Sequence, residues 1–242
     1  MPLKQLPDAA GALATLPGHE LADTTLHRVW RDDLADGTTR SQPWFFASVP
    51  DDPQAGGRFD LPSALGGTCY LAAQPVAALL EALQAMLPII PERELQLRRR
   101  TEIQAPTDAP VAADLMAAAA TGFGVASALW SASERATTQA WAAALRRDGW
   151  WALWAGAQHD TTTQGRAVPL FDVTDGPHPP SGQQWPSTRP IRLETDLDLI
   201  AALADRGWNV RGPATCRMRA IRPEPAGARY RCPVAVGREP GG

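Results

Sequence analysis

Residues 68–81 read TCYLAAQPVAALLE, and this stretch joins a predicted strand to a predicted helix. The strand covers residues 68–72, a run of mainly β-forming and apolar side chains that follows two glycines. Pro75 suits the first turn of a helix, because the N–H that proline lacks would have no partner there. Apolar side chains then recur at helical spacing as far as Leu87, where prolines end the pattern. The stretch therefore predicts a strand that is followed at once by a helix.

Glu81 points away from the leucine stripe of this predicted helix, on the side that carries Ala77, Ala78 and Ala85. Two interpretations are open. A solvated glutamate is favoured by pattern alone, because fully buried glutamates are uncommon. The alternative is a carboxylate held over a surface of small side chains that another layer of the structure approaches.

Predicted strands and helices follow one another irregularly along the rest of the chain. Apolar and alternating runs predict strands at residues 26–30, 95–98, 150–154 and 167–171. Alanine-rich composition predicts helices at residues 111–120 and 133–147. A late helix is predicted to begin near Thr195 and Asp198 and to end at Gly207. Residues 172–190 are rich in Pro, Gly and Ser and predict a long loop. Without a regular β-α-β rhythm, an α+β fold is favoured over a doubly wound sheet.

Length and composition predict one large domain with tails. The chain has 242 residues, of which 44% are hydrophobic, and this is enough to bury a sizeable core. We expect an N-terminal lead at residues 1–23 and a folded domain at residues 24–222. Residues 223–242 are rich in Pro, Gly and Arg and are expected to be disordered.

Charge and cysteine content exclude several classes of protein. A formal net charge of −3 gives no electrostatic case for binding nucleic acid directly, and we interpret the local run from Arg98 to Arg100 as a solvated face. The three cysteines form no CxxC pair and are expected to be reduced thiols. We see no signal peptide and no apolar run of the roughly 18 residues that cross a bilayer. A soluble, cytoplasmic protein without a membrane partner is expected.

Motifs for metals and nucleotides are weak in this sequence. The four histidines are too scattered to indicate a zinc site, so no metal is expected. The run Gly122-Phe123-Gly124 begins like a dinucleotide fingerprint, but Ser127 stands where the third glycine belongs. A predicted helix also precedes the run where the fingerprint requires a strand. We interpret the run as a loop that ends a helix.

Several segments, taken in order, resemble the RES domain family. The most telling spacing is Tyr70 on a strand and Glu81 on a helix eleven residues later. The other segments that carry the resemblance are LHRVW (26–30), GGRFD (56–60), TQAWA (138–142), VPLFD (168–172) and the late helix (198–207). Their order and approximate spacing match the family from about residue 24 to about residue 211. The resemblance implies an α+β domain similar to the ADP-ribosyltransferase fold, with mixed strands and flanking helices.

The family is named after an arginine, a glutamate and a serine, and the resemblance carries these over onto particular residues. It assigns the glutamate to Glu81 and the arginine to Arg28 or Arg58, and it gives Glu81 and Arg28 catalytic roles. It places Arg28, Arg58 and Tyr70 around the substrate. In the segment AGAQHD (155–160), Ala157 takes the place of the serine at the substrate, so that hydroxyl is missing.

The resemblance implies an enzyme that degrades NAD, as a phosphorylase or a glycohydrolase, and that serves as the toxin of a toxin–antitoxin pair. It implies NAD as substrate, inorganic phosphate as a co-substrate of a phosphorylase, no cofactor, and an antitoxin protein as partner. A carboxylate lowers the barrier by stabilising the positive charge that develops on the ribose. Guanidinium groups bind pyrophosphate oxygens, and Tyr70 would stack on the nicotinamide ring or hydrogen-bond near the ribose.

Two other interpretations stay open. The missing serine favours a RES-like domain that lacks full catalytic competence and binds a nucleotide or a partner protein. An ADP-ribosyltransferase that modifies a macromolecule, with residues 172–190 in recognition, is the third. Either enzyme requires the first strand, the Gly-Arg turn and the proline-led helix to meet, which predicts Arg28, Arg58 and Glu81 around one cleft. The sequence does not fix the oligomeric state, and a homo-oligomer stays open.

Overall fold

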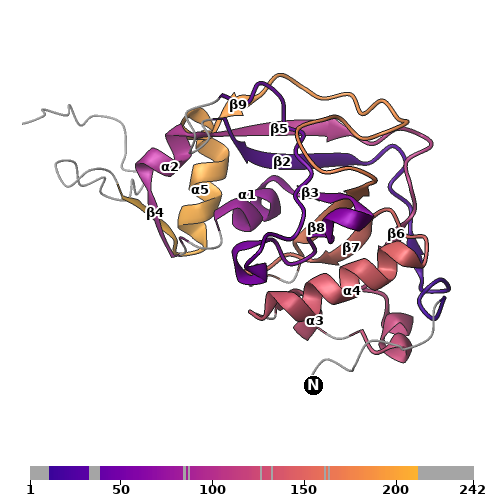
Figure 1. The fold of residues 1–242 in the computed structure, drawn as a ribbon. Helices are drawn as coiled ribbons and strands as arrows, with labels where there is room; N and C mark the ends of the chain where they lie inside the picture. The colour runs from indigo at the N-terminus through magenta and orange to yellow at the C-terminus, as the bar shows by residue number, and fades with distance from the viewer. Residues whose placement is uncertain are drawn as a thin grey trace, which may run out of the picture.

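A computed structural model describes residues 11–32, 39–83, 86, 88–125, 127–131, 133–160, 162 and 164–211. Its centre is a mixed sheet of eight strands in the order β1-β6-β7-β8-β3-β2-β5-β9 (Figure 1). Neighbouring strands are antiparallel except β6 and β7, which are parallel. The strands of this sheet are β1 (Gly18–His19), β2 (Thr25–Arg31), β3 (Gly67–Ala72), β5 (Arg98–Gln104), β6 (Ala112–Asp114), β7 (Leu153–Gly156), β8 (Arg166–Asp172) and β9 (Ile191–Arg192). Strands β4 (Ile89–Pro91) and β10 (Asn209–Arg211) form a separate parallel pair.

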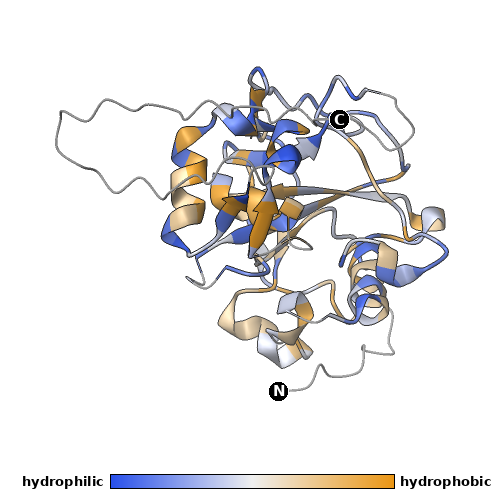
Figure 2. Ribbon diagram, turned by 90° about the vertical axis from the view of Figure 1, so that its left-hand side faces the viewer, coloured by the Kyte–Doolittle hydropathy of each residue, from blue (hydrophilic) through white to orange (hydrophobic). Residues whose placement is uncertain are grey.

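Helices cover one face of the large sheet, and loops cover the other. The helices are α1 (Pro75–Leu83), α2 (Glu92–Gln96), α3 (Ala128–Ser131), α4 (Arg135–Arg147) and α5 (Leu197–Asp205). Side chains alternate across β3, so Tyr70 and Ala72 pack toward the helices while Cys69 and Leu71 pack toward the loops. In Figure 2 the most hydrophobic residues gather in the strands at the centre of the fold.

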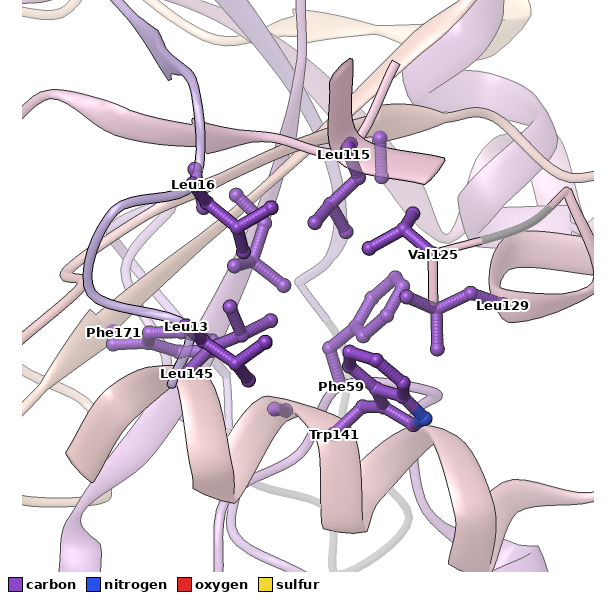
Figure 3. Packing of buried hydrophobic residues seen from close by; sticks show 14 of the residues in the cluster. Leu13, Leu16, Phe59, Leu115, Val125, Leu129, Trp141, Leu145 and Phe171 are labelled. Carbon is purple, nitrogen blue, oxygen red and sulfur yellow. The ribbon is translucent and has the colours of Figure 1, made fainter. Parts of the chain in front are cut away.

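Three buried clusters form the core. On the helix side, Trp141 of α4 packs with Phe59 and Leu129 in one cluster (Figure 3), and α1 and α5 pack against the sheet in another. On the opposite side, the aromatic rings of Trp44 and Trp185 pack over β3 and β8. The predicted α+β fold is confirmed, and the predicted strands at residues 26–30, 68–72 and 167–171 are observed as β2, β3 and β8.

The predicted helix at residues 111–120 is wrong. This segment instead forms β6, which pairs with β1 and β7, and then a 3-10 helix at Ala118–Phe123. Sheet pairing overrides the helix propensity of alanine, because buried Ala112 and Ala113 fit between two neighbouring strands. The run Gly122-Phe123-Gly124 ends the 3-10 helix, and Gly124 adopts a left-handed conformation at its cap.

Three boundaries also differ from prediction. The strand predicted at residues 95–98 starts only at Arg98, because Leu95 belongs to α2 and is buried against α1 and α5. The strand predicted at residues 150–154 lies at β7 instead. The late helix is capped by the Asp196 side chain, which accepts a hydrogen bond from the Leu199 N–H, and not by Thr195. Gly207 follows this helix at a positive φ of 75°, as expected for a residue just past a helix end.

The described part of the N-terminal lead packs on the domain. Leu13 and Leu16 are buried, and the backbone N–H groups of Gly11 and Leu13 donate to Asp148 at 2.8 Å. Residues 1–10 and the predicted tail at residues 223–242 lie outside the described residues, as do residues 212–222. Among the helices that are described, none has the length and apolar character needed to cross a membrane.

The run from Arg98 to Arg100 is not a solvated face. Each of these side chains is only 11 to 15% exposed and pairs with a carboxylate. Arg98 pairs with Glu94, Arg99 with Asp32, and Arg100 with both Glu102 and Asp196. The run therefore links β5 to neighbouring elements through ion pairs.

Candidate functional site

A cavity opens in the middle of the sheet, where two neighbouring strands separate. Strands β2 and β3 lie side by side, yet they pair in register only at His27 and Ala72. A cavity of about 260 Å³ lies at this gap, between the two strands, α1 and the loop before β3. Its lining residues are Arg28, Val29, Trp30, Arg31, Arg40, Gly57, Arg58, Tyr70, Leu71, Ala78, Glu81, Ala82 and Arg98.

Four of the five residues predicted at the substrate lie around this cavity. Arg28, Arg58, Tyr70 and Glu81 all line it, so the predicted convergence on one cleft is confirmed. Ala157 does not line it. The chemical roles given to these residues are not decided by position alone, and they stay predictions.

Glu81 is a buried carboxylate that is held from both sides. Its side chain is 7% exposed, Arg58 donates to Oε2, and the backbone N–H of Gln158 donates to Oε1 at 2.7 Å. The solvated interpretation of Glu81 is therefore wrong. Helix α1 buries Ala77 and Ala78 against the sheet, and their small side chains let the carboxylate approach the gap between the strands.

Arg58 is almost completely buried, at 1% exposure, and each of its two terminal nitrogens donates a hydrogen bond within the protein. It donates to Glu81 and to the backbone carbonyl of Trp130. The next residue, Phe59, inserts into the core beside Trp141 (Figure 3), which fixes the position of the arginine. This arrangement suits Arg58 better to orienting Glu81 than to binding pyrophosphate, the role expected from the sequence.

Two residues that the sequence analysis did not single out hold the loop of Arg58 in place. Asp60 accepts hydrogen bonds from the Gly57 N–H at 2.6 Å and from the Tyr70 hydroxyl at 2.9 Å. Gln139 of α4 donates from Nε2 to the carbonyls of Pro53 and Gly57, both at 3.0 Å. A polar side chain on the buried face of an amphipathic helix was the available signal for Gln139, and its place in the GGRFD segment was the signal for Asp60.

The hydroxyl of Tyr70 is already committed within the protein. It donates to Asp60 and accepts from the Phe59 N–H at 2.7 Å. Burial raises the pKa of Tyr70 well above its usual value, and the nearby charge of Asp60 raises it further. The phenol therefore stays neutral. Of the two predicted roles, stacking of the ring on a substrate fits this environment better than a hydrogen bond to the ribose.

Burial raises the pKa of Asp60 from 3.8 to about 6, although hydrogen bonds from Gly57 and Tyr70 oppose the shift. A carboxyl group with a raised pKa binds its proton more tightly in the folded state than in the unfolded state. Protonation of Asp60 therefore contributes fully to the unfolding free energy below about pH 4, and this contribution is lost as the pH rises through about 6. Relative to Asp60→Asn, the wild type should lose up to about 3 kcal/mol of unfolding free energy between pH 4 and pH 7. Urea denaturation of both proteins across this range measures the difference, and a difference that does not vary with pH would contradict the burial of this charge.

Arg28 reaches from β2 to the loop side of the sheet. Its guanidinium donates to the Cys69 sulfur and to the Phe45 carbonyl at 3.3 Å. Arg40 lies over the ring of Phe45, 4.3 Å from its centre, and the neighbouring charge of Arg28 adds to burial in lowering the pKa of Arg40. This side of the cavity thus presents two adjacent cations.

Ala157 lies in the hydrophobic cluster between α1 and α5, and it is 8% exposed. We expect Ala157→Ser to bury its hydroxyl among apolar side chains, to lower the unfolding free energy by about 1–3 kcal/mol, and to leave any activity unchanged. Thermal denaturation and a turnover assay measure the two effects. A gain in rate of tenfold or more would show instead that residue 157 reaches the substrate.

Comparison with known proteins agrees with this architecture. A family model described as RES domain matches residues 25–190. Among solved structures, the chain is similar to a chain from the crystal structure of the M. tuberculosis MbcT–MbcA toxin–antitoxin complex, with a TM-score of 0.54 and 17% identity. That match covers 80% of this chain and 98% of the other. No curated protein matches the chain.

Proposed function

The chain belongs to the RES domain family, and we propose that it degrades NAD by breaking the bond between nicotinamide and ribose. One observation carries the proposal. A buried carboxylate, Glu81, has a fixed orientation at the wall of a cleft that five arginines also line. The carboxylate complements a positive charge that forms only in the transition state. The arginines complement an anionic dinucleotide.

Glu81 would act by electrostatics. As the bond between ribose C1′ and the nicotinamide nitrogen breaks, its electron pair leaves with nicotinamide, and positive charge develops on the ribose. A carboxylate that Arg58 and the Gln158 N–H already orient needs no reorganisation to stabilise that charge. A new bond from C1′ to an oxygen of phosphate, or to the oxygen of water with release of a proton to solvent, then completes the reaction.

The remaining lining residues would hold the dinucleotide. Arg28 and Arg40 lie next to each other on the loop side. They suit the pyrophosphate, because each guanidinium can donate two parallel hydrogen bonds to phosphate oxygens. The ring of Tyr70 lines the same cavity and would stack on the nicotinamide. Arg58 would act through Glu81.

A toxin role with an antitoxin partner is supported by the family and by the likeness to a chain of a toxin–antitoxin complex. The second candidate function is binding of a nucleotide or a partner protein without turnover. It requires residue 157 to reach the substrate, where an alanine lacks the hydroxyl of the family's serine, and the packing of Ala157 in the apolar cluster with α1 and α5 argues against that position.

Incubation of the purified protein with NAD, with and without inorganic phosphate, tests the proposal. We expect release of nicotinamide. Release that requires phosphate identifies a phosphorylase, and release without phosphate identifies a glycohydrolase. Binding of NAD without release would support the second candidate, and neither binding nor release would refute both.

A further inference from the structure

The arginines of the cleft carry more positive charge than its carboxylates neutralise. Arg58 pairs with Glu81, and Arg98 pairs with Glu94 at 3.0 Å. Across the described residues, no carboxylate forms an ion pair with Arg28, Arg31 or Arg40. The pyrophosphate of NAD brings two negative charges, so one guanidinium would be left uncompensated.

The uncompensated arginines lie on two different faces of the sheet. Arg28 and Arg40 lie on the loop side with Cys69 and Phe45. Arg31 is three residues further along β2 and therefore points to the opposite face, as does Val29, which packs with α1. A pyrophosphate bound by the first pair thus leaves Arg31 unoccupied, about 10 Å further along the strand.

Arg31 and Arg98 stand directly opposite each other on neighbouring strands, since they are register partners in the pairing of β2 with β5. Like charges in this position repel each other. The charge of Arg31 also contributes, after burial, to a lowered pKa of Arg98. The Nε atoms of both side chains are buried and have no hydrogen-bond partner among the described residues. Two guanidinium groups with free donors therefore face one cavity on the side of Glu81 and α1.

We propose that Arg31 and Arg98 form a second anion subsite that binds a phosphate dianion in addition to the pyrophosphate. The subsite deepens the proposed function, because it belongs to the same cleft. The dianion has two sources with the same chemistry. One is the phosphate monoester of a dinucleotide phosphorylated on its adenosine ribose, and the other is free inorganic phosphate.

Calorimetric titration without turnover tests the subsite. Wild type, Arg31→Gln and Arg31→Lys are titrated with inorganic phosphate, with 5′-AMP and with adenosine 2′,5′-bisphosphate. Arg192→Gln is the matched control, because Arg192 is 60% exposed and pairs with Glu194 on the surface. We expect Arg31→Gln to weaken binding of the dianion by about tenfold or more, with partial recovery in Arg31→Lys and no change in the control.

The outcomes separate the two sources. If the bisphosphate binds more tightly than 5′-AMP and Arg31→Gln removes the advantage, the source is a phosphorylated dinucleotide. If only inorganic phosphate depends on Arg31, the source is the free ion. The subsite is overturned if Arg31→Gln binds all of these ligands as tightly as the wild type does. It is also overturned if the wild type binds neither inorganic phosphate nor the bisphosphate. If the protein cleaves NAD but phosphate binding does not depend on Arg31, the proposed function stands and the subsite does not. If phosphate binding depends on Arg31 but NAD is not cleaved, the subsite stands and the proposed function does not.

Discussion

Glu81→Gln should lower the rate of nicotinamide release by at least about 10²–10³-fold, the loss seen when one preorganised electrostatic contact to a transition state is removed. Glutamine keeps the size of the side chain and one oxygen that can accept from the Gln158 N–H. It removes the negative charge that would face the ribose. Binding of intact NAD should change far less than the rate, because the positive charge on the ribose develops only in the transition state.

Glu194→Gln is the matched control for this experiment. Glu194 also pairs with an arginine, but it does not line the cleft, and its side chain is 30% exposed. Its rate should equal that of the wild type. If Glu81→Gln also turned over at the wild-type rate, Glu81 would not be the group that stabilises the transition state.

Arg58→Met should lower the unfolding free energy by about 3–5 kcal/mol, because it leaves the carboxylate of Glu81 buried without its cationic partner. The double variant Arg58→Met/Glu81→Gln should be more stable than Arg58→Met alone, since both members of the buried pair are then neutral. Urea denaturation of the single and double variants measures both effects. Arg192→Met, which breaks a surface pair, should cost no more than about 1 kcal/mol.

The comparison of single and double variants distinguishes a charge effect from a packing effect. If the double variant were as unstable as Arg58→Met or less stable, the loss would come from the missing aliphatic stem and not from an unpaired charge. Arg58 would then be a packing residue, and its part in orienting Glu81 would need another explanation.

The sequence predicted the parts of the site that depend on local pattern and ordered spacing. Proline placement and helical spacing located α1, and the eleven-residue spacing from Tyr70 brought both residues to the cleft. The burial of Glu81 could not be predicted, since a helical wheel shows which face a residue occupies and not which layer covers that face. The partner that buries it, Arg58, is 23 residues away in sequence.

Other features depend on contacts that no local pattern contains. Alanines at residues 111–120 read as a helix, yet pairing with β1 and β7 makes part of this segment a strand. Asp60 and Gln139 matter because they bind backbone groups of the loop that carries Arg58, and Gln139 does so from a helix 82 residues further along the chain. The separation of β2 from β3, which creates the cavity, likewise becomes visible only in three dimensions.

A crystal structure of Glu81→Gln soaked with NAD is the most direct test of where the dinucleotide binds. We expect an intact dinucleotide in the gap between β2 and β3, with the nicotinamide ribose beside residue 81, the ring of Tyr70 against the nicotinamide, and the pyrophosphate on Arg28 and Arg40. NAD bound at another surface, or bound in the gap with the ribose remote from residue 81, would contradict it.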